Sequence, residues 1–507
     1  MNPINIFTFS QAISKLPLSE AEKYFASQAN IAKETNLKDY ELHSLSSFVN
    51  LAYERYDVPL SSFEGFAYSY SIPQIAKEFD LLKVYDDLVL NIELKSSEVE
   101  IYKINKQLSR NSYYLQHLDR PLLLFTYVSS ADKWWCFCAE NQTFAPSCWS
   151  EVLPALNHEC SYYLGDYNRL FHAEKFLISP FNNPDAFLKK AYYLTNQQES
   201  FETQILSSFQ SNPKSFQCAK ITGAAGTGKT LLLYDIAVKA SAILQKPSCV
   251  IHGGTLNDGQ VSLNRRQNDI RIISAKDASK PSFIQEAYGL ICFDESQRIY
   301  KTQLNTLIKT AQDLKQACIF SIDSSQSLSK TEGMFENEKV IDDLSGPLNT
   351  FTLTEKIRTN EEIAAFIKAM LQLNRKSNKD YNYPIKILYA DNQKIAVDII
   401  SHLESQDYKY IPFTNSTFKR SSLDYLQLAH HLNSHKVIGQ EFNSVVVTID
   451  EYFFYDENNH LQACEHPNPD YLLVRLLFQA VTRAREKLAV VIVNNPSVFQ
   501  KMLFILQ

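Results

Sequence analysis

The sequence predicts an α/β fold whose central region, residues 216–345, forms a doubly wound parallel sheet. Apolar runs of strand length alternate with helix-length segments throughout this region. A glycine-rich turn, ITGAAGTGKT (221–230), separates the first apolar run from the first helical segment. Two later apolar runs end in Asp294 and Asp323, as expected for strands whose carboxyl ends line a binding crevice.

The composition is that of a soluble globular protein. The 507 residues suffice for two to four domains, and 45% of them are hydrophobic and 21% charged. No apolar run reaches about 18 residues, and the N-terminal stretch lacks a basic region followed by an apolar block. We therefore expect a cytoplasmic protein with no membrane partner. The net charge of −6 gives no general attraction to nucleic acid, so such binding needs a local basic groove.

The stretch GAAGTGKT matches the phosphate-binding pattern G-x-x-x-x-G-K-S/T. Its glycines, Gly223, Gly226 and Gly228, allow a tight turn that points successive N–H groups at phosphate oxygens. Lys229 is expected to reach the β and γ phosphates, and the Thr230 hydroxyl to hold Mg²⁺. A chance glycine turn before a helix is the alternative, and the apolar run and helix on either side argue against it.

Acidic residues at later strand ends fit the same nucleotide site. We expect Asp294 to make a second Mg²⁺ contact and Glu295 to orient water or act as a general base. The following strand ends in Asp323, with Gln326 close behind. Taken singly, these acidic turns are typical of a protein surface, but their order after a phosphate loop favours catalysis.

From about residue 200 to the C-terminus, these segments resemble the motifs of superfamily 1 helicases in order. The resemblance implies two RecA-like lobes of the P-loop NTPase class, ATP hydrolysis with Mg²⁺, and nucleic acid as partner. FTLTEKIRTN (351–360) is similar to motif IV, NSHKVIGQEFNSVVVTID (433–450) to motif V, and LLFQAVTRAREKLAVVIV (476–493) to motif VI.

The family pattern also implies roles for particular residues. It places Arg358 and Arg483 on the γ-phosphate, with Arg483 as the arginine finger. It places Glu441 near the ribose, Gln204 at the adenine, and Gln326 among the nucleotide-binding residues. Solvated charges at helix ends are the alternative for the two arginines.

The chain departs from the family pattern after the third motif. Ile322 stands where many members have glycine, and SLSKTEG (327–333) lacks the aromatic residues that stack on bases. This implies that the chain binds a nucleic-acid strand through its phosphates and not by base stacking. The short spans between motifs are most similar to the Schlafen-type branch of the superfamily.

A second candidate site lies in the N-terminal third. VLNIELK (89–95) reads as a strand that projects Glu93 and Lys95 from one face, and EFDLLKVY (78–85) as its neighbour, which carries Asp80. Carboxylates held close together repel unless a cation neutralises them. We therefore expect Asp80 and Glu93 to bind Mg²⁺, with Lys95 assisting the attacking water or the developing charge.

The same segment resembles the PD-(D/E)xK nucleases, specifically members in which the following helix supplies a glutamine and tyrosines. Gln107 and Tyr114 stand at that place, although the proline before the aspartate is missing. The resemblance implies an α/β restriction-endonuclease-like domain. The alternative is a half-exposed hairpin with ordinary surface charges, since D-x(n)-E-x-K recurs often by chance.

Cysteines form a further group between these regions. The nine in the chain favour reduced thiols over a disulfide framework. Near the N-terminal third the candidates for a metal cluster have no C-x-x-C spacing, and we expect buried free thiols instead. The residues concerned are Cys136, Cys138, Cys148, His158 and Cys160.

The predicted domains are 1–165 (nuclease-like), 166–200 (linker), 201–345 (first lobe, ATP-binding) and 346–507 (second lobe). Together they predict an ATP-dependent helicase or translocase fused to a Mg²⁺-dependent nuclease. The resemblance to bacterial nuclease-helicases implies anti-phage defence, with DNA favoured over RNA. A repair or RNA-remodelling helicase with an inactive nuclease-like clamp, and a partner-gated ATPase switch, remain as alternatives.

Overall fold

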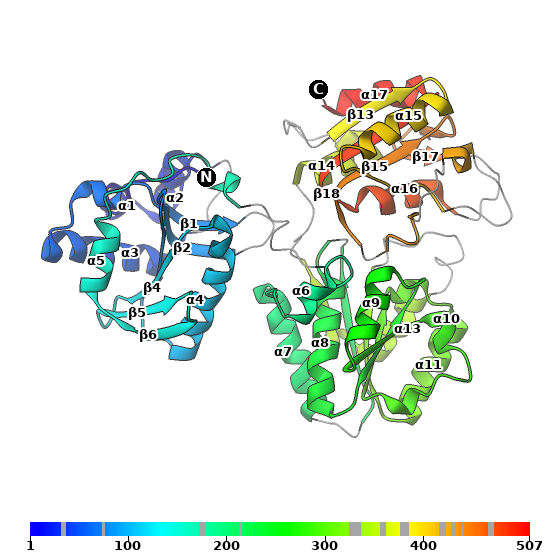
Figure 1. Cartoon of the computed structure of the whole chain (residues 1–507), viewed down its shortest axis with the longest axis horizontal. Coiled ribbons are helices and arrows are strands. Elements are labelled where there is room, and N and C mark those ends of the chain that lie inside the picture. Colours follow the sequence, from blue (N-terminus) through cyan, green and yellow to red (C-terminus); the bar gives the residue numbers. More distant parts are fainter. Residues whose placement is uncertain are drawn as a thin grey trace. The chain divides into compact units, whose positions relative to one another are not determined.

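The computed structural model divides the chain into two compact units, Met1–Phe176 and Leu177–Gln507 (Figure 1). None of the helices within the described ranges is long and apolar enough to cross a bilayer. The structure describes residues 1–31, 37–72, 77–171, 179–211, 215–224, 226–323, 336–354, 361–375, 385–414, 422–426, 432–438, 440–464 and 471–506.

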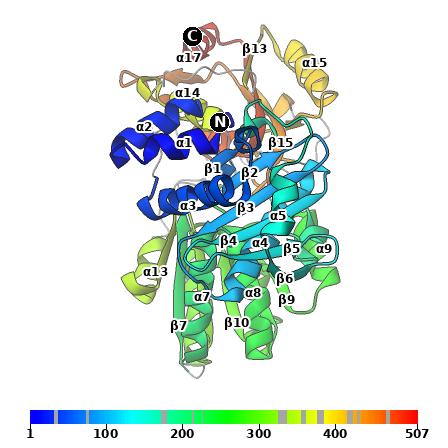
Figure 2. The ribbon, with the colours of Figure 1, turned by 90° about the vertical axis from the view of Figure 1, so that its left-hand side faces the viewer.

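The N-terminal unit contains a six-stranded sheet whose strands follow chain order (Figure 2). Neighbouring strands are antiparallel except β3 and β4, which are parallel and joined through helix α4. The strands are β1 (Ala67–Ile72), β2 (Lys77–Val84), β3 (Val89–Lys95), β4 (Leu122–Val128), β5 (Lys133–Cys138) and β6 (Thr143–Ser147). The helices are α1 (Ile6–Ile13), α2 (Leu18–Gln28), α3 (Asp39–Tyr56), α4 (Ile101–Leu115) and α5 (Trp149–Leu156).

Alternation along β3 separates the apolar core of this unit from its polar face. Leu90, Ile92 and Leu94 pack with residues of α1, α2, α3 and α5 in one core cluster. Asn91 and Glu93 therefore point to the opposite face, where α4 lies. The strand predicted at 89–95 is confirmed.

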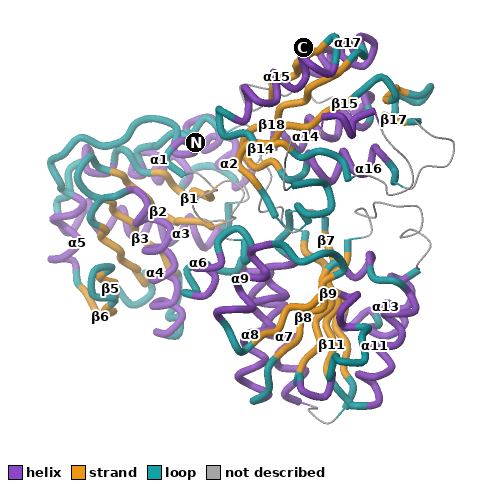
Figure 3. The backbone as a smooth tube through the Cα atoms, turned by 45° about the vertical axis from the view of Figure 1, so that its right-hand side comes forward, coloured by secondary structure: helices purple, strands orange, loops and turns teal. Residues whose placement is uncertain are grey.

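The C-terminal unit begins with a six-stranded parallel sheet of order β12-β7-β11-β10-β8-β9 (Figure 3). Its strands are β7 (Gln217–Gly223), β8 (Ser248–His252), β9 (Ile270–Ser274), β10 (Leu290–Asp294), β11 (Ala317–Ile322) and β12 (Thr350–Leu353). Its helices are α6 (Pro184–Leu188), α7 (Asn196–Ser211), α8 (Lys229–Leu244), α9 (Asp258–Arg266), α10 (Ala275–Ala278), α11 (Lys301–Asp313) and α13 (Asn337–Ser345).

Two core clusters cover the two faces of this sheet. One contains α7, α8 and α9 and the other contains α10, α11 and α13, so successive residues of β10 belong to different clusters. Buried on both faces, the strands have the continuous apolar runs seen in the sequence. The predicted doubly wound parallel sheet is confirmed.

A second parallel sheet follows, of order β13-β18-β15-β14, with a small antiparallel hairpin beside it. The strands are β13 (Ile385–Ala390), β14 (Lys409–Tyr410), β15 (Phe442–Ile449), β16 (Phe453–Tyr455), β17 (Leu461–Ala463) and β18 (Ala484–Val493). The helices are α14 (Glu361–Leu371), α15 (Gln393–Glu404), α16 (Leu473–Val481) and α17 (Pro496–Leu506). The α/β class with two parallel-sheet lobes after an α/β N-terminal domain is thus confirmed.

Element placement near the expected boundaries differs in detail from the sequence expectation. Helix α6 and the first residues of α7 lie within the predicted linker, 166–200, and both helices contribute to the core of the first parallel sheet. Strand β12 lies beyond residue 345 yet pairs with β7. The last strand of the first sheet therefore returns to the edge beside the phosphate loop.

Candidate functional site

The phosphate loop joins the carboxyl end of β7 to α8. Gly226 and Gly228 have φ of +78° and +83°, the left-handed region in which a side chain is strained. Gly223 lies so close to β12 that an added Cβ would come within 2.7 Å of the backbone oxygen of Leu353. These three positions therefore require glycine, and α8 begins directly after the loop.

Lys229 folds back over this loop. Its ammonium donates to the backbone oxygens of Gly223 at 2.6 Å and Ala224 at 2.9 Å, and to the Asp323 carboxylate at 3.1 Å. Thr230 follows in the first turn of α8 and is partly exposed. The ammonium, the helix N-terminus and the loop N–H groups form a site suited to phosphate.

Asp294 ends β10 beside His252, which ends the neighbouring strand β8. Asp294 is 1% exposed, and neither carboxylate oxygen accepts a hydrogen bond from the part of the chain that the structure describes. His252 Nδ1 lies 3.4 Å from Asp294 Oδ2. A buried carboxylate without donors is costly unless a cation balances it, and Mg²⁺ prefers such oxygen ligands. The Asp294 carboxylate therefore fits a ligand of a Mg²⁺ ion.

Glu295 lies at the turn after β10 in a left-handed conformation, with φ of +55°. Its Oε2 accepts a hydrogen bond from Gln297 Nε2 at 2.7 Å and pairs with Arg298 Nε at 3.3 Å. Gln297 Oε1 also accepts the backbone N–H of Asp323 at 3.2 Å. These contacts fix the Glu295 carboxylate and link two strand ends. Neither Gln297 nor Arg298 was predicted, although both directly follow the acidic pair.

Arg483, between α16 and β18, is buried at 5% exposure. It donates to the backbone oxygens of Gln479 at 3.2 Å and Gln440 at 3.1 Å. Burial lowers the pKa of Arg483, while the nearby charges of Glu441, Glu295 and Asp323 favour its protonated form. The electrostatic environment of Arg483 thus includes two carboxylates from the nucleotide end of the first parallel sheet.

The Glu441 side chain is buried, and its carboxylate forms an ion pair with Arg485. Its Oε2 accepts hydrogen-bond and ion-pair contacts from Arg485 Nε and Nη2, both at 3.0 Å. The backbone oxygen of Glu441 accepts a hydrogen bond from Asn182 Nδ2. Asn182 was not predicted, because a single asparagine in a loop gives no sequence signal.

Gln204 lies on α7 and is exposed, and its amide donates to Ser200 Oγ at 3.1 Å. On the same helix, buried Gln198 donates to the backbone oxygen of Thr227 in the phosphate loop at 3.1 Å. Among the described contacts of α7, it is Gln198 that reaches the loop. The NQQ stretch at the start of α7 was the available signal for it.

Two predicted nucleotide-site residues, Arg358 and Gln326, lie outside the described residues, as does the stretch 327–333. Ile322, which stands where the family often has glycine, ends β11 and is buried.

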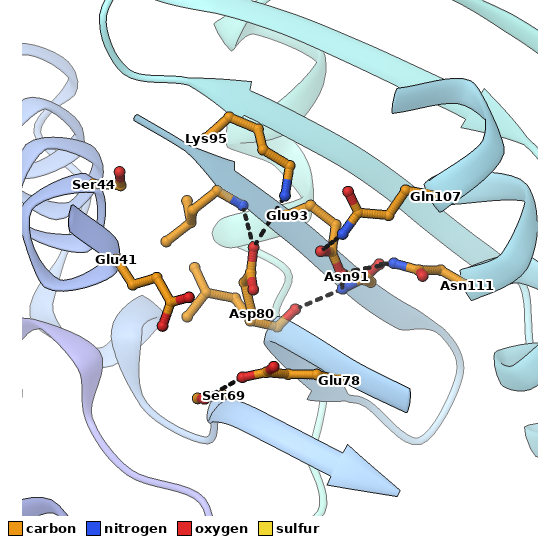
Figure 4. A network of polar contacts seen from close by, with 12 residues as sticks. Glu41, Ser44, Ser69, Glu78, Asp80, Asn91, Glu93, Lys95, Gln107 and Asn111 are labelled. Atoms are coloured by element: carbon orange, nitrogen blue, oxygen red, sulfur yellow. Dashed lines mark hydrogen bonds and ion pairs between the residues drawn. The ribbon is translucent and has the colours of Figure 1, made fainter. Parts of the chain in front are cut away.

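The N-terminal candidates gather on β2, β3 and α4 (Figure 4). The antiparallel register pairs Leu81 with Ile92, which sets Asp80 against Glu93 on the neighbouring strand. Asp80 Oδ2 accepts the backbone N–H of Leu94 at 2.8 Å and lies 3.8 Å from Lys95 Nζ. Two carboxylates and a lysine therefore meet at one place on the sheet.

Amide side chains hold the buried Glu93 carboxylate. Oε1 accepts from Asn111 Nδ2 at 2.7 Å and from Asn91 Nδ2 at 3.2 Å, and Oε2 accepts from Gln107 Nε2. Asn111 also donates to Asn91 Oδ1 at 2.6 Å. Gln107 and Asn111 are one turn apart on α4, so both reach the same carboxylate. Asn91 and Asn111 were not predicted; polar residues at buried positions of a strand and a helix were their only signal.

Burial, and then the nearby Glu93 charge, raise the pKa of Asp80 to about 8, although Lys95 and the Leu94 N–H oppose this shift. A cation bound between Asp80 and Glu93 would neutralise both carboxylates and so stabilise the ionised form of Asp80. Asp80 and Glu93 therefore fit a divalent metal with oxygen ligands such as Mg²⁺. Tyr114 is buried on α4, away from solvent.

Replacing Asn111 with alanine should lower the free energy of unfolding by about 1–3 kcal/mol, because buried acceptors on Glu93 and Asn91 lose their donor. Denaturant unfolding measures this loss. Lys103→Ala on the same helix removes exposed contacts with Glu100 and the Tyr102 ring and should change stability by less than about 0.5 kcal/mol. Equal effects of the two substitutions would contradict the buried network.

The prediction of buried thiols in the N-terminal unit is wrong. Cys138 and Cys148 are exposed, and Cys136 and Cys160 are partly exposed. Cys136 and Cys138 lie on β5, next to the edge strand β6, where the sheet is incompletely covered. The four cysteines of the first parallel sheet are buried instead: Cys218, Cys249, Cys292 and Cys318. All nine cysteines are free thiols.

Comparison with known proteins finds a family model that matches part of the C-terminal unit. Residues 217–421 match the model of the Schlafen group 3 DNA/RNA helicase domain. Among solved structures, the Pif1 helicase from Candida albicans is 14% identical with a TM-score of 0.33, over 59% of this chain and 94% of that chain. A search of curated proteins found no match. Residues 217–421, which contain the phosphate loop, Asp294 and Glu295, are thus similar to the Schlafen group 3 DNA/RNA helicase domain.

Proposed function

We propose that the chain is an ATP-driven nucleic-acid helicase or translocase fused to a Mg²⁺-dependent nuclease that acts on DNA in bacterial anti-phage defence. The observation that carries the nuclease assignment is the meeting of Asp80, Glu93, Lys95 and Gln107 on one face of the N-terminal sheet. The defence role rests on the resemblance to bacterial nuclease-helicases alone.

In the proposed ATP site, the residues of the first parallel sheet bind the triphosphate of ATP and its Mg²⁺ ion or position the attacking water. The loop N–H groups and Lys229 bind the β and γ phosphates, and Thr230 and Asp294 would hold Mg²⁺, which neutralises developing charge. Glu295, fixed by Gln297 and Arg298, orients the attacking water and accepts its proton.

Arg483 completes this site from the second parallel-sheet lobe. Its guanidinium stabilises charge on the γ-phosphate oxygens, and its environment already includes Glu295 and Asp323. Because the phosphate loop and Arg483 belong to different sheets, ATP binding draws the lobes together and hydrolysis releases them. This change in lobe spacing is the step that moves the protein along nucleic acid.

In the nuclease, Asp80 and Glu93 would hold Mg²⁺, which supplies a Lewis acid for phosphodiester hydrolysis. Lys95, on the same face of β3 as Glu93, assists the attacking water or stabilises the pentavalent phosphate. Gln107 and Asn111 keep Glu93 in the orientation that faces Asp80.

Cleavage should rise with pH, because the raised pKa of Asp80 keeps this group protonated near neutrality and only its carboxylate binds the metal. At limiting Mg²⁺, we expect close to a tenfold gain between about pH 6 and 7 and a plateau above about pH 9. More Mg²⁺ should shift the rising part to lower pH, since the cation favours the ionised form. Initial cleavage rates measured over this pH range test the prediction. A rate that stays constant or falls with pH would contradict the assignment of Asp80 as a metal ligand.

Incubating the purified chain with labelled single- and double-stranded DNA and RNA, with and without ATP and Mg²⁺, tests the proposed function. We expect the chain to cleave DNA only when Mg²⁺ is present, and we expect ATP to change the rate of this cleavage. Unwinding without cleavage would support the alternative of an inactive nuclease-like clamp, in repair or RNA remodelling. ATP hydrolysis that ignores every nucleic acid would support a partner-gated switch instead.

A further inference from the structure

A histidine, a cysteine and an aspartate meet outside both sites described above. Asp87 lies in the turn between β2 and β3, and His158 and Cys160 lie in the segment that follows α5. His158 Nε2 is 2.9 Å from both oxygens of Asp87, and Cys160 contacts the same carboxylate. One ligand atom from each of the three residues lies within 4.8 Å of the others.

Backbone contacts hold the two segments together independently of these side chains. Asp86 N–H donates to the Ser161 oxygen at 2.9 Å, and Tyr163 N–H donates to the Val84 oxygen at 2.8 Å. Between them, Tyr85 and Tyr162 form an antiparallel bridge. The ligand positions are therefore set by the fold, as a metal site requires.

Ring packing restricts His158 further. The Tyr85 ring packs edge-on against the imidazole with centroids 5.0 Å apart. Tyr85 is fully buried and its hydroxyl donates to the Ala155 oxygen at 3.2 Å. The Tyr85 ring thus restricts the orientation of the His158 imidazole, whose Nε2 points toward Asp87.

The Cys160 thiol lies next to a negatively charged group. Its sulfur contacts the Asp87 carboxylate, which also pairs with His158. A divalent cation among the three groups would displace the thiol proton and remove the repulsion between sulfur and carboxylate. A His158–Asp87 ion pair alone gives no reason for a sulfur at this place.

We propose that Asp87, His158 and Cys160 bind Zn²⁺, with water in the fourth position. Imidazole nitrogen, thiolate sulfur and carboxylate oxygen are all ligands that zinc accepts, and such a mixed set disfavours Mg²⁺ and Ca²⁺. The ion joins the β2–β3 turn to the segment after α5. Asp80 lies roughly 13 Å further along β2, so the zinc site is separate from the proposed nuclease centre.

Zinc titration of the purified chain against a colorimetric chelator tests this proposal, with Co²⁺ as a spectroscopic probe. We expect one Zn²⁺ per chain and a thiolate-to-Co²⁺ charge-transfer band, both lost in Cys160→Ala and His158→Ala. Each substitution should weaken binding by at least about 10²-fold, since changes outside the ligand shell already cost about 10- to 100-fold. Cys138→Ala, which removes an exposed thiol elsewhere in the unit, should bind as the original chain does.

Cys160→His keeps a zinc ligand, so it should retain Zn²⁺ and lose only the charge-transfer band. This variant guards against misfolding of the alanine variants. A chain that binds no Zn²⁺ at micromolar concentration, or that binds it equally without Cys160 and His158, would overturn the proposal. These outcomes do not depend on nuclease or ATPase activity.

Discussion

Arg483→Ala is expected to lower kcat for ATP hydrolysis by roughly 10³-fold or more, the range found when an arginine finger is lost. Arg483 is nearly fully buried, and its guanidinium is influenced by Glu295 and Asp323. In the proposed role its positive charge would act on the γ-phosphate oxygens chiefly in the transition state, where their charge is redistributed. ATP affinity, measured by fluorescent-nucleotide titration, should therefore change far less than kcat.

The matched control is Arg475→Ala. Arg475 lies on α16 in the same segment but is exposed. It should leave kcat within about twofold, as surface substitutions usually do. Arg483→Lys keeps the charge without the planar fork and should recover only part of the rate. A folded Arg483→Ala variant with normal kcat would exclude this residue as the finger.

Glu93→Gln is expected to lower Mg²⁺-dependent cleavage by at least about 10²-fold, since it removes one anionic ligand from the metal that stabilises the transition state. The substitution is nearly isosteric. It also places an amide opposite the donors Gln107 and Asn111, so the network must rearrange. Cleavage of labelled DNA at saturating Mg²⁺ measures the loss, and ATP hydrolysis provides an independent readout of folding.

Glu98→Gln serves as the control for this variant. Glu98 follows β3 closely but pairs with Lys133 at the surface, at 2.7 Å. Its loss should leave both cleavage and ATP hydrolysis unchanged within about twofold. If Glu93→Gln cleaves as fast as the original chain, the N-terminal unit is no nuclease of the proposed kind, and the motor assignment stands by itself.

Regular patterns in the sequence predicted most of the fold. Continuous apolar runs identified the strands of the first parallel sheet because both faces of that sheet are buried. The alternating stretch 89–95 identified β3 because one face of the strand is apolar and the other carries the polar Asn91 and Glu93, although both faces are buried. Strand β12 was harder to place, because its four residues return to the first sheet after a helix.

The site residues that the sequence predicts are those with a motif around them. Those it missed act through contacts that only the fold creates. Gln198 reaches the phosphate loop from a helix that precedes it, and Asn182 bonds a backbone oxygen from far along the chain. His252 meets Asp294 because β8 and β10 are neighbours in the sheet, although another strand lies between them in sequence.

The proposed zinc ligands were hidden for a related reason. Cys160 and His158 were noticed only as part of a group with Cys136, Cys138 and Cys148, whose spacing fits no familiar metal pattern. Their partner Asp87 comes from a turn distant in sequence, which the backbone contacts at Asp86 and Tyr163 bring alongside.

As a motor, the chain would hold ATP between the phosphate loop and positive side chains of the second parallel-sheet lobe, and nucleic acid would promote this closure. Steady-state ATP hydrolysis with and without single-stranded nucleic acid, in the original chain and in Lys229→Ala, tests this claim most directly. We predict hydrolysis that single strands stimulate in the original chain and no hydrolysis above background in Lys229→Ala. Hydrolysis that persists in Lys229→Ala, or that single-stranded DNA and RNA both leave unchanged, would contradict the claim.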